Sequence, residues 1–210
     1  MTTVAVIDYG MGNLRSVSKA IEHVAPRATV KLTASAAEIR AADRVVFPGQ
    51  GAIGGCLAAL GQGGLRESVV EALAAKPFLG ICLGLQALYE FSEEGGGTPC
   101  LKVLPGSVKR FQPKDASLKV PHMGWNQVHQ QRTHPLWDGI EQDARFYFVH
   151  SYYADSAQAQ DAVGTTEYGL RFTAAAARDN IFAVQFHPEK SQRAGLRLLE
   201  NFIAWDGNRQ

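Results

Sequence analysis

The sequence predicts an α/β fold: a single domain with an open, mixed but mainly parallel sheet and helices on both faces. Three observations predict it. Apolar runs alternate with helical patterns over residues 1–100, strand-like runs separated by turn residues fill the second half, and neither a linker nor an internal repeat interrupts the chain. A chain of 210 residues buries roughly 70% of its unfolded surface. We therefore expect one domain over residues 1–210.

Four runs in the first half are expected to be strands of a parallel sheet. Three are continuously apolar, which is typical of strands covered on both faces, and the second is more exposed. In chain order the runs are Val4–Ile7, Thr29–Leu32, Val45–Phe47 and Phe78–Ile81.

Two amphipathic helices are expected between these strands, because apolar residues recur there three or four positions apart. The apolar positions are Leu14, Val17, Ile21 and Val24 in the first helix and Leu65, Val69, Ala72 and Leu73 in the second. Asn13 is the expected N-cap of the first helix, and Pro26 follows its end.

The second half is rich in strand-like runs, and turn signals such as Pro105–Gly106 and Asp138–Gly139 separate them. We expect several to extend the same sheet as antiparallel strands. The runs are Val108–Phe111, Leu118–Val128, Arg145–Tyr153, Ala162–Thr166, Arg171–Ala177 and Phe182–Phe186. A last helix is expected where Leu196, Leu199, Phe202 and Ile203 form one apolar stripe.

Composition excludes several classes of protein. The 21 basic and 20 acidic residues nearly cancel, which argues against a nucleic-acid-binding arm, and no apolar run approaches the roughly 18 residues of a membrane span. The N-terminal residues lack the basic flank and long apolar core of a secretion signal. Cys56, Cys82 and Cys100 form no CxxC pair, so neither a disulfide framework nor a structural zinc site is expected. We expect a cytoplasmic protein with no bound metal.

Two glycine-rich stretches follow predicted strands. Gly10-Met11-Gly12 resembles a dinucleotide-binding turn, but Arg15 stands where the third small residue belongs, so no nucleotide cofactor is expected. Seven of the sixteen residues in 49–64 are glycine. This stretch is either a loop that brings backbone N–H groups close to a ligand or a flexible loop with no such role.

A cysteine stands at the junction between a predicted strand and a helical pattern through Leu85, Leu88 and Phe91. Gly80, Cys82 and Gly84 form the cysteine version of a nucleophile elbow, in which flanking glycines permit a sharp turn that exposes the side chain. The helix N-terminus favours the thiolate, and the N–H of Leu83 is expected to stabilise an oxyanion. The alternative is a buried core cysteine, as expected for Cys56 and Cys100.

A thiolate nucleophile needs a base, and His187 is the candidate. Pro188 excludes a helical conformation at His187, and residues two apart in an extended chain point the same way. Glu189 is therefore expected beside the imidazole, where it fixes the tautomer. A zinc site is disfavoured because the sequence has no HExxH motif and no cysteine at ligand spacing.

The residues therefore predict a Cys82–His187–Glu189 hydrolase or acyl transferase that acts through a thioester. The second oxyanion donor is expected from the backbone of Gly49–Gly51. The triad alone does not identify the amide that is attacked.

The motifs resemble those of the class I (triad) glutamine amidotransferases, over essentially the whole chain, and this implies a flavodoxin-like sheet. The matching segments are Pro48–Gly51, Gly80–Gln86 and His187–Glu189. Further segments resemble the glutaminase subunits of imidazole glycerol phosphate synthases, enzymes of histidine biosynthesis. These are Asp8–Val17, Pro121–Asn126, Phe148–Tyr152 and Lys190-Ser191.

The resemblance implies that Cys82 attacks the side-chain amide of glutamine and that His187 protonates the leaving ammonia, with no cofactor. By analogy, the backbone and side chains that hold glutamine are those of Gly49, Gln50, Gly51, Gln86, Ser151 and Tyr152.

The resemblance also implies a partner, a (β/α)8-barrel cyclase subunit that receives the ammonia in a heterodimer. The amidotransferase pattern occupies all 210 residues, so we expect the acceptor site on another chain. Asn13, Trp125, Tyr147 and Lys190 match partner-facing positions of the family. The alternatives are core packing for Trp125 and a solvated surface charge for Lys190.

The chain departs from the family pattern in two places. Within the oxyanion loop, Gln50 stands where the family usually has a small apolar residue. The resemblance implies that the peptide there reorients before it donates to the oxyanion. Cys100 and Lys102 stand where glycines are common before the Pro105–Gly106 turn.

Three alternative functions stay open: the glutaminase of another amidotransferase, a stand-alone cysteine hydrolase of this architecture, and a binding subunit whose triad is a relic.

Overall fold

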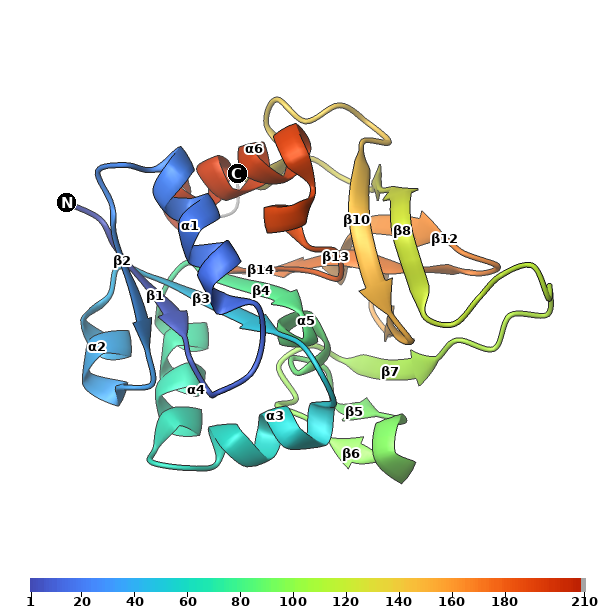
Figure 1. Cartoon of the computed structure of the whole chain (residues 1–210), viewed down its shortest axis with the longest axis horizontal. Coiled ribbons are helices and arrows are strands. Elements are labelled where there is room, and N and C mark those ends of the chain that lie inside the picture. Colours follow the sequence, from blue (N-terminus) through green and yellow to red (C-terminus); the bar gives the residue numbers. More distant parts are fainter. Residues whose placement is uncertain (209–210) are drawn as a thin grey trace.

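A computed structural model describes residues 1–208 and shows one large mixed sheet between two layers of helices (Figure 1). Within these residues, twelve strands form the sheet in the order β2-β1-β3-β4-β14-β13-β11-β7-β5-β6, with β12 on β13 and β9 on β12. The strands from β2 to β14 are parallel, and β13, β11 and β7 continue the sheet antiparallel. The predicted open, mixed and mainly parallel sheet is confirmed.

The bounds of the elements follow the predicted runs closely in the first half. The strands are β1 (Thr3–Ile7), β2 (Thr29–Thr33), β3 (Arg44–Gly49), β4 (Phe78–Cys82), β5 (Phe91–Ser92), β6 (Thr98–Pro99), β7 (Gly106–Arg110), β8 (His122–Gln127), β9 (His129–Gln130), β10 (Arg145–His150), β11 (Tyr152–Ser156), β12 (Ala162–Glu167), β13 (Arg171–Arg178) and β14 (Ile181–Val184). The helices are α1 (Leu14–Val24), α2 (Ala36–Ala41), α3 (Ile53–Leu60), α4 (Leu65–Ala75), α5 (Leu83–Gln86) and α6 (Gln192–Ala204).

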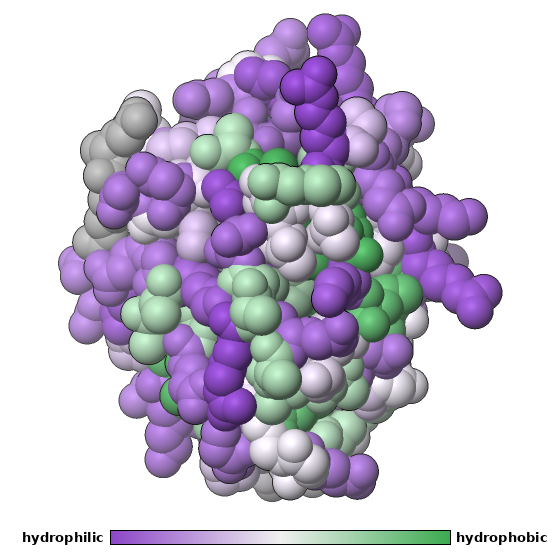
Figure 2. All heavy atoms as spheres, turned by 90° about the vertical axis from the view of Figure 1, so that its left-hand side faces the viewer, coloured by the Kyte–Doolittle hydropathy of each residue, from purple (hydrophilic) through white to green (hydrophobic). Residues whose placement is uncertain are grey.

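The central strands are buried because helices cover both faces of the sheet. On one face, α1 and α6 pack against each other and against the sheet. On the other face lie α2, α3, α4 and α5, which form the second apolar core with the opposite side of β1, β3 and β4 (Figure 1). Strand β2 is one edge strand of the sheet. The surface of the molecule at this end carries both hydrophilic and hydrophobic residues (Figure 2).

The register of β3 and β4 positions the site. These parallel strands are paired so that Gly49, the last residue of β3, lies opposite Cys82, the last residue of β4. Because the carboxyl ends of parallel strands meet at one edge of the sheet, the glycine-rich loop after β3 and the elbow after β4 are neighbours there.

The second half differs from the prediction in its strand partners. The run Arg145–Tyr153 was expected as one strand, but it breaks at Ser151 into β10 and β11. Strand β10 pairs with β8 in a separate two-stranded sheet, while β11 pairs with β7 and β13 in the main sheet. The expectation that Leu118–Val128 is all strand is also wrong, because β8 begins only at His122. A chain that changes sheets keeps its strand-like pattern, so periodicity does not reveal the break.

Three local predictions need correction. The helical pattern after Cys82 ends at Gln86, and Phe91 lies in β5 with 42% of its surface exposed. Residues 49–64 are not one loop, because α3 lies within them. Asn13 does precede α1, but its side chain makes no capping hydrogen bond.

Among residues 1–208, no helix has the length and apolar character needed to cross a membrane.

Candidate active site

Cys82 occupies the sharp junction between β4 and α5 that the elbow motif predicts. Its backbone is strained, with φ 55° and ψ −104°, in a region that residues with a side chain rarely adopt. A Cβ on Gly84 would lie 1.9 Å from the carbonyl oxygen of Phe47, so only glycine permits this approach of α5 to β3. The helix is only four residues long, so its contribution to a thiolate is smaller than the sequence suggested.

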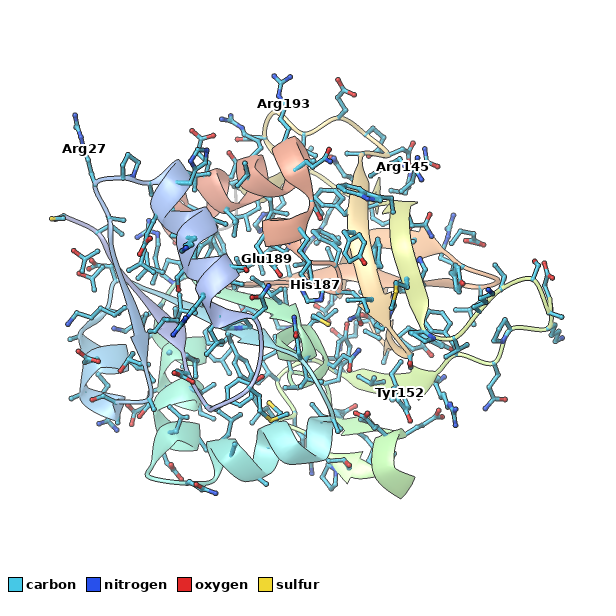
Figure 3. The ribbon with its side chains drawn as sticks, viewed as in Figure 1. Arg27, Arg145, Tyr152, His187, Glu189 and Arg193 are labelled. Atoms are coloured by element: carbon cyan, nitrogen blue, oxygen red, sulfur yellow. The ribbon has the colours of Figure 1, made fainter. Side chains whose placement is uncertain are left out.

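His187 and Glu189 form a buried pair. Nδ1 of His187 lies 2.9 Å from Oε1 of Glu189, and the two side chains are 3% and 1% exposed. Figure 3 shows them side by side at the centre of the molecule. The predicted contact is present but its predicted cause is wrong, because residues Pro188–Lys190 form a 3-10 turn (η4) rather than extended chain.

Ser191 fixes the backbone of this pair. Its Oγ donates to the carbonyl oxygen of His187 at 2.6 Å and accepts from the N–H of Tyr147 at 2.9 Å. The N–H of His187 donates to the carbonyl oxygen of Tyr147 at 2.9 Å. The turn that carries the triad histidine is therefore anchored to β10.

The imidazole is oriented for proton transfer at one nitrogen. Glu189 accepts from Nδ1–H, which leaves Nε2 for the substrate side, and Nε2 is buried with no hydrogen-bond partner among residues 1–208. Burial lowers the pKa of His187, but the neighbouring Cys82 and Glu189 outweigh it and raise the pKa from 6.5 to about 10. The neighbours of the ring therefore favour its charged, imidazolium form.

These residues lie at a cavity of about 440 Å³. Its lining includes most of the predicted site, namely Gln50, Gly51, Cys82, Leu83, Gln86, Ser151, Tyr152, His187 and Lys190. Gly49 lies directly behind this lining, because a Cβ there would be 2.8 Å from the Cβ of Leu83. Glu189 supports the ring of His187 without lining the cavity. The geometry suits attack by a thiolate on a small amide.

Sequence reasoning missed Glu94, which also lines the cavity. Its Oε2 accepts from the N–H of Ile53 at 2.8 Å, so the start of α3 holds the carboxylate in place. No motif surrounds Glu94, and it lies on a short 3-10 turn (η1, Glu94–Gly96) beyond the elbow. The pairing of β5 with β7 and the hydrogen bond from Ile53 bring this turn to the site.

Two buried histidines also escaped prediction. Nδ1 of His122 lies 2.9 Å from Nε2 of His150, and Nδ1 of His150 lies 2.7 Å from the carbonyl oxygen of Tyr152. That carbonyl can only accept, so Nδ1 of His150 donates and its Nε2 accepts from His122. Burial lowers the pKa of His122 to about 4 and that of His150 to about 3, so both rings are neutral.

The four residues expected to face a partner are not in the core. Trp125 is 37% exposed, and its ring centroid lies 6.1 Å from that of Tyr147 on the paired strand β10. Core packing of Trp125 is therefore the wrong alternative. Asn13, Tyr147 and Lys190 are half-buried. Lys190 also lines the cavity.

Among residues 1–208, no three or more His, Cys, Asp or Glu side chains are grouped so that they could hold a metal ion.

Solved structures resemble this fold over nearly its whole length. A putative GMP synthase subunit from Thermoplasma acidophilum superposes with a TM-score of 0.70 at 20% identity, covering 97% of this chain and 93% of that one. PurLQS from Thermotoga maritima superposes with a TM-score of 0.73 at 16% identity, covering 97% and 98%. At these identities the likeness concerns the fold alone.

The sequence itself matches the family described as "Glutamine amidotransferase class-I" over residues 5–205. The chain therefore belongs to the class I glutamine amidotransferases. It is similar to "Imidazole glycerol phosphate synthase subunit HisH" of Nitrosococcus oceani, with 59% identity over 99% of both chains. The protein of the same name from Nitrosomonas europaea is 59% identical over 98% of this chain and 99% of the relative. The chain is thus a member of the HisH family, and the predicted family and enzyme class are confirmed.

Proposed function

We propose that this chain hydrolyses glutamine to glutamate and ammonia as the glutaminase subunit of an imidazole glycerol phosphate synthase in histidine biosynthesis. Its ammonia serves a cyclase subunit that makes imidazole glycerol phosphate and aminoimidazole carboxamide ribotide. One observation carries the proposal: a cysteine at a strained strand–helix junction shares a cavity with an imidazolium held by a buried carboxylate.

In the first half-reaction, the sulfur of Cys82 bonds to the side-chain carbonyl carbon of glutamine. The carbonyl oxygen becomes an oxyanion, which the N–H of Leu83 and the backbone of Gly49–Gly51 stabilise. His187 gives its Nε2 proton to the amide nitrogen, the carbon–nitrogen bond breaks, and ammonia leaves. A glutamyl thioester and a neutral imidazole remain.

In the second half-reaction, His187 takes a proton from water, and the hydroxide adds to the thioester carbon. The carbon–sulfur bond breaks, glutamate leaves, and the thiolate–imidazolium pair is restored. Glu189 holds the ring in one tautomer throughout and stabilises its charged form.

Glutamine is proposed to lie in the cavity between the glycine-rich loop and β11. Gln50, Gly51, Gln86, Ser151 and Tyr152 surround it. Glu94 supplies a fixed carboxylate, which suits the α-ammonium group of glutamine.

The proposed partner is a (β/α)8-barrel cyclase subunit in a heterodimer. Asn13, Trp125, Tyr147 and Lys190 are proposed to face it. Met123, 62% exposed on the same strand as Trp125, adds apolar area to that face. We further propose that the amidotransferase domain spans residues 1–210 and acts in the cytoplasm, where its three free cysteines stay reduced.

A steady-state assay with and without the cyclase tests this function. Glutamine hydrolysis is expected to rise when the cyclase binds, because a misoriented oxyanion donor in the isolated subunit costs ~10²–10³ in rate. Cys82→Ala is expected to abolish glutamine hydrolysis, while the complex still uses free ammonium. Turnover of other amides and no complex with a cyclase would instead support a stand-alone hydrolase.

A further inference from the structure

Gln185 is a fully buried polar residue that the mechanism above does not use. It follows β14, two residues before His187, and its side chain is 0% exposed. Its Nε2 lies 3.6 Å from the sulfur of Cys82, within hydrogen-bonding range for a sulfur acceptor. Within residues 1–208, the N–H₂ group of Gln185 has no hydrogen-bond acceptor other than this sulfur.

The orientation of the Gln185 amide follows from a chain of hydrogen bonds that starts at a backbone carbonyl. The carbonyl oxygen of Tyr152 can only accept, and Nε2 of Gln86 donates to it at 3.0 Å. Nε2 of Gln86 also donates to Oε1 of Gln185 at 3.0 Å. A reversed Gln185 amide would set its N–H₂ against that of Gln86. The N–H₂ group of Gln185 therefore points at the sulfur.

Among residues 1–208, the sulfur thus has Gln185 as its hydrogen-bond donor. His187 lines the same cavity as Cys82, and Gln185 follows β14, whose last residue, Val184, pairs with Ile81 of the neighbouring strand β4. Leaving the N–H₂ group of Gln185 unpaired in this interior would be costly, and a thiolate is a better acceptor than a thiol. The interaction therefore favours the charged, nucleophilic form of the cysteine.

We propose that Gln185 is a further catalytic residue, which donates an N–H···S hydrogen bond to the Cys82 thiolate and stabilises it before attack and again when the thioester breaks. Gln86 is a positioning residue that holds the Gln185 amide in this orientation. The proposal deepens the glutaminase function and rests on Cys82 being its nucleophile. No covalent step is added to that mechanism.

The test compares Gln185→Glu with the matched control Gln160→Glu. Gln160 is exposed on the short turn η3 (Ala159–Asp161), so Gln160→Glu adds the same negative charge at a position away from the site. The cysteines are alkylated with iodoacetamide from pH 5 to pH 10, and the Cys82 peptide is quantified by mass spectrometry. Glutamine-dependent and ammonium-dependent synthesis are then measured in the complex with the cyclase.

For Gln185→Glu, the midpoint of the Cys82 alkylation profile is expected to rise by at least one pH unit. Glutamine-dependent kcat is expected to fall about 10- to 100-fold, the size expected for a hydrogen bond to a charged group. Ammonium-dependent synthesis and the Gln160→Glu profile are expected to stay unchanged. An unchanged alkylation profile in a folded Gln185→Glu variant would overturn the proposal.

Gln185→Met keeps the side-chain volume and removes the donor, so it provides the test if the glutamate variant does not fold. It is expected to raise the same midpoint, and an unchanged midpoint would again overturn the proposal.

Alkylation reports on the sulfur of Cys82 whether or not glutamine is turned over. A wild-type complex whose glutamine hydrolysis does not depend on Cys82 would contradict the proposed function, and the alkylation result would still show whether Gln185 acts on the sulfur.

Discussion

Nδ1 of His187 lies 2.9 Å from Oε1 of Glu189, and both side chains are almost completely buried. A buried carboxylate at this distance holds the ring in one tautomer and offsets the cost of burying a charged imidazole. It also leaves Nε2 as the nitrogen that exchanges protons in the cavity. The pair therefore holds the His187 ring, just beyond the end of β14, in the protonation state that proton transfer at Nε2 requires.

Replacing Glu189 with Gln is expected to lower the pKa of His187 from about 10 towards neutrality, because the nearby negative charge is lost. Glutaminase kcat in the complex should fall roughly 10²–10⁴-fold. The imidazole protons, followed by NMR against pH, measure the first effect, and a coupled assay measures the second. Glu200→Gln, at an exposed ion pair on α6, is the control. A Glu189→Gln variant with wild-type titration and rate would refute the role of the carboxylate.

The close approach at the elbow predicts opposite effects for two glycine substitutions. Gly84→Ala would place a Cβ 1.9 Å from the Phe47 carbonyl oxygen, so it should destabilise the fold by at least a few kcal/mol and abolish activity. Gly54→Ala, in helix α3 with nothing within 4 Å, should stabilise by about 0.5–1 kcal/mol. Denaturant unfolding measures both. Equal effects of the two changes would contradict the packing described for Gly84.

The buried histidine pair predicts a loss of stability in mild acid. The folded-state pKa values of about 4 for His122 and about 3 for His150 lie below the ordinary 6.5. The unfolded chain therefore binds more protons as the pH falls below 6.5. Each histidine then lowers the free energy of unfolding with a slope that approaches about 1.4 kcal/mol per pH unit near pH 5. His187, whose pKa is raised, adds an opposite slope near pH 6.5, where its unfolded form is only partly charged, and this slope vanishes towards pH 5, where it is charged in both states.

Chemical unfolding between pH 6.5 and 5 measures this slope. His150→Gln should make the slope shallower by about one such contribution, whereas His23→Gln, at an exposed position on α1, should leave it unchanged. The same slope in the wild type and in His150→Gln would show that this ring is not held neutral by burial.

Substitutions of two tryptophans should separate an effect on cyclase affinity from an effect on the free energy of unfolding. Trp125→Ala, at an exposed site on β8, should weaken the complex with the cyclase by about 2 kcal/mol or more and leave the unfolding free energy nearly unchanged. Trp137→Ala, in the core, should cost about 3–5 kcal/mol of stability. Titration calorimetry with the cyclase and denaturant unfolding measure the two quantities. Normal cyclase affinity in Trp125→Ala would remove this residue from the proposed interface.

The sequence predicted best those features that depend on short segments. The strands around Val4–Ile7, Val45–Phe47 and Phe78–Ile81 are apolar because both of their faces are buried, so their composition alone identifies them. The elbow at Cys82 was predictable because the glycines that permit it lie two residues away on either side.

Features that depend on distant contacts were not predictable in this way. The change of sheet at Ser151 leaves the strand pattern intact, and Glu94 reaches the cavity through the pairing of β5 with β7 and a contact with α3. Gln185 stands only two residues before His187, but the orientation of its amide towards Cys82 depends on Gln86 and on the carbonyl of Tyr152. Such roles arise from the assembled sheet rather than from neighbours in the chain.

Identifying the nucleophile tests the account most directly. The complex with the cyclase is treated with a diazoketone analogue of glutamine, and the modified peptide is located by mass spectrometry in the wild type and in Cys82→Ala. We predict one adduct, on Cys82, that glutamine protects against and that is absent from the variant. An adduct on another residue, or equal labelling of Cys82→Ala, would contradict the assignment of Cys82 as the attacking group.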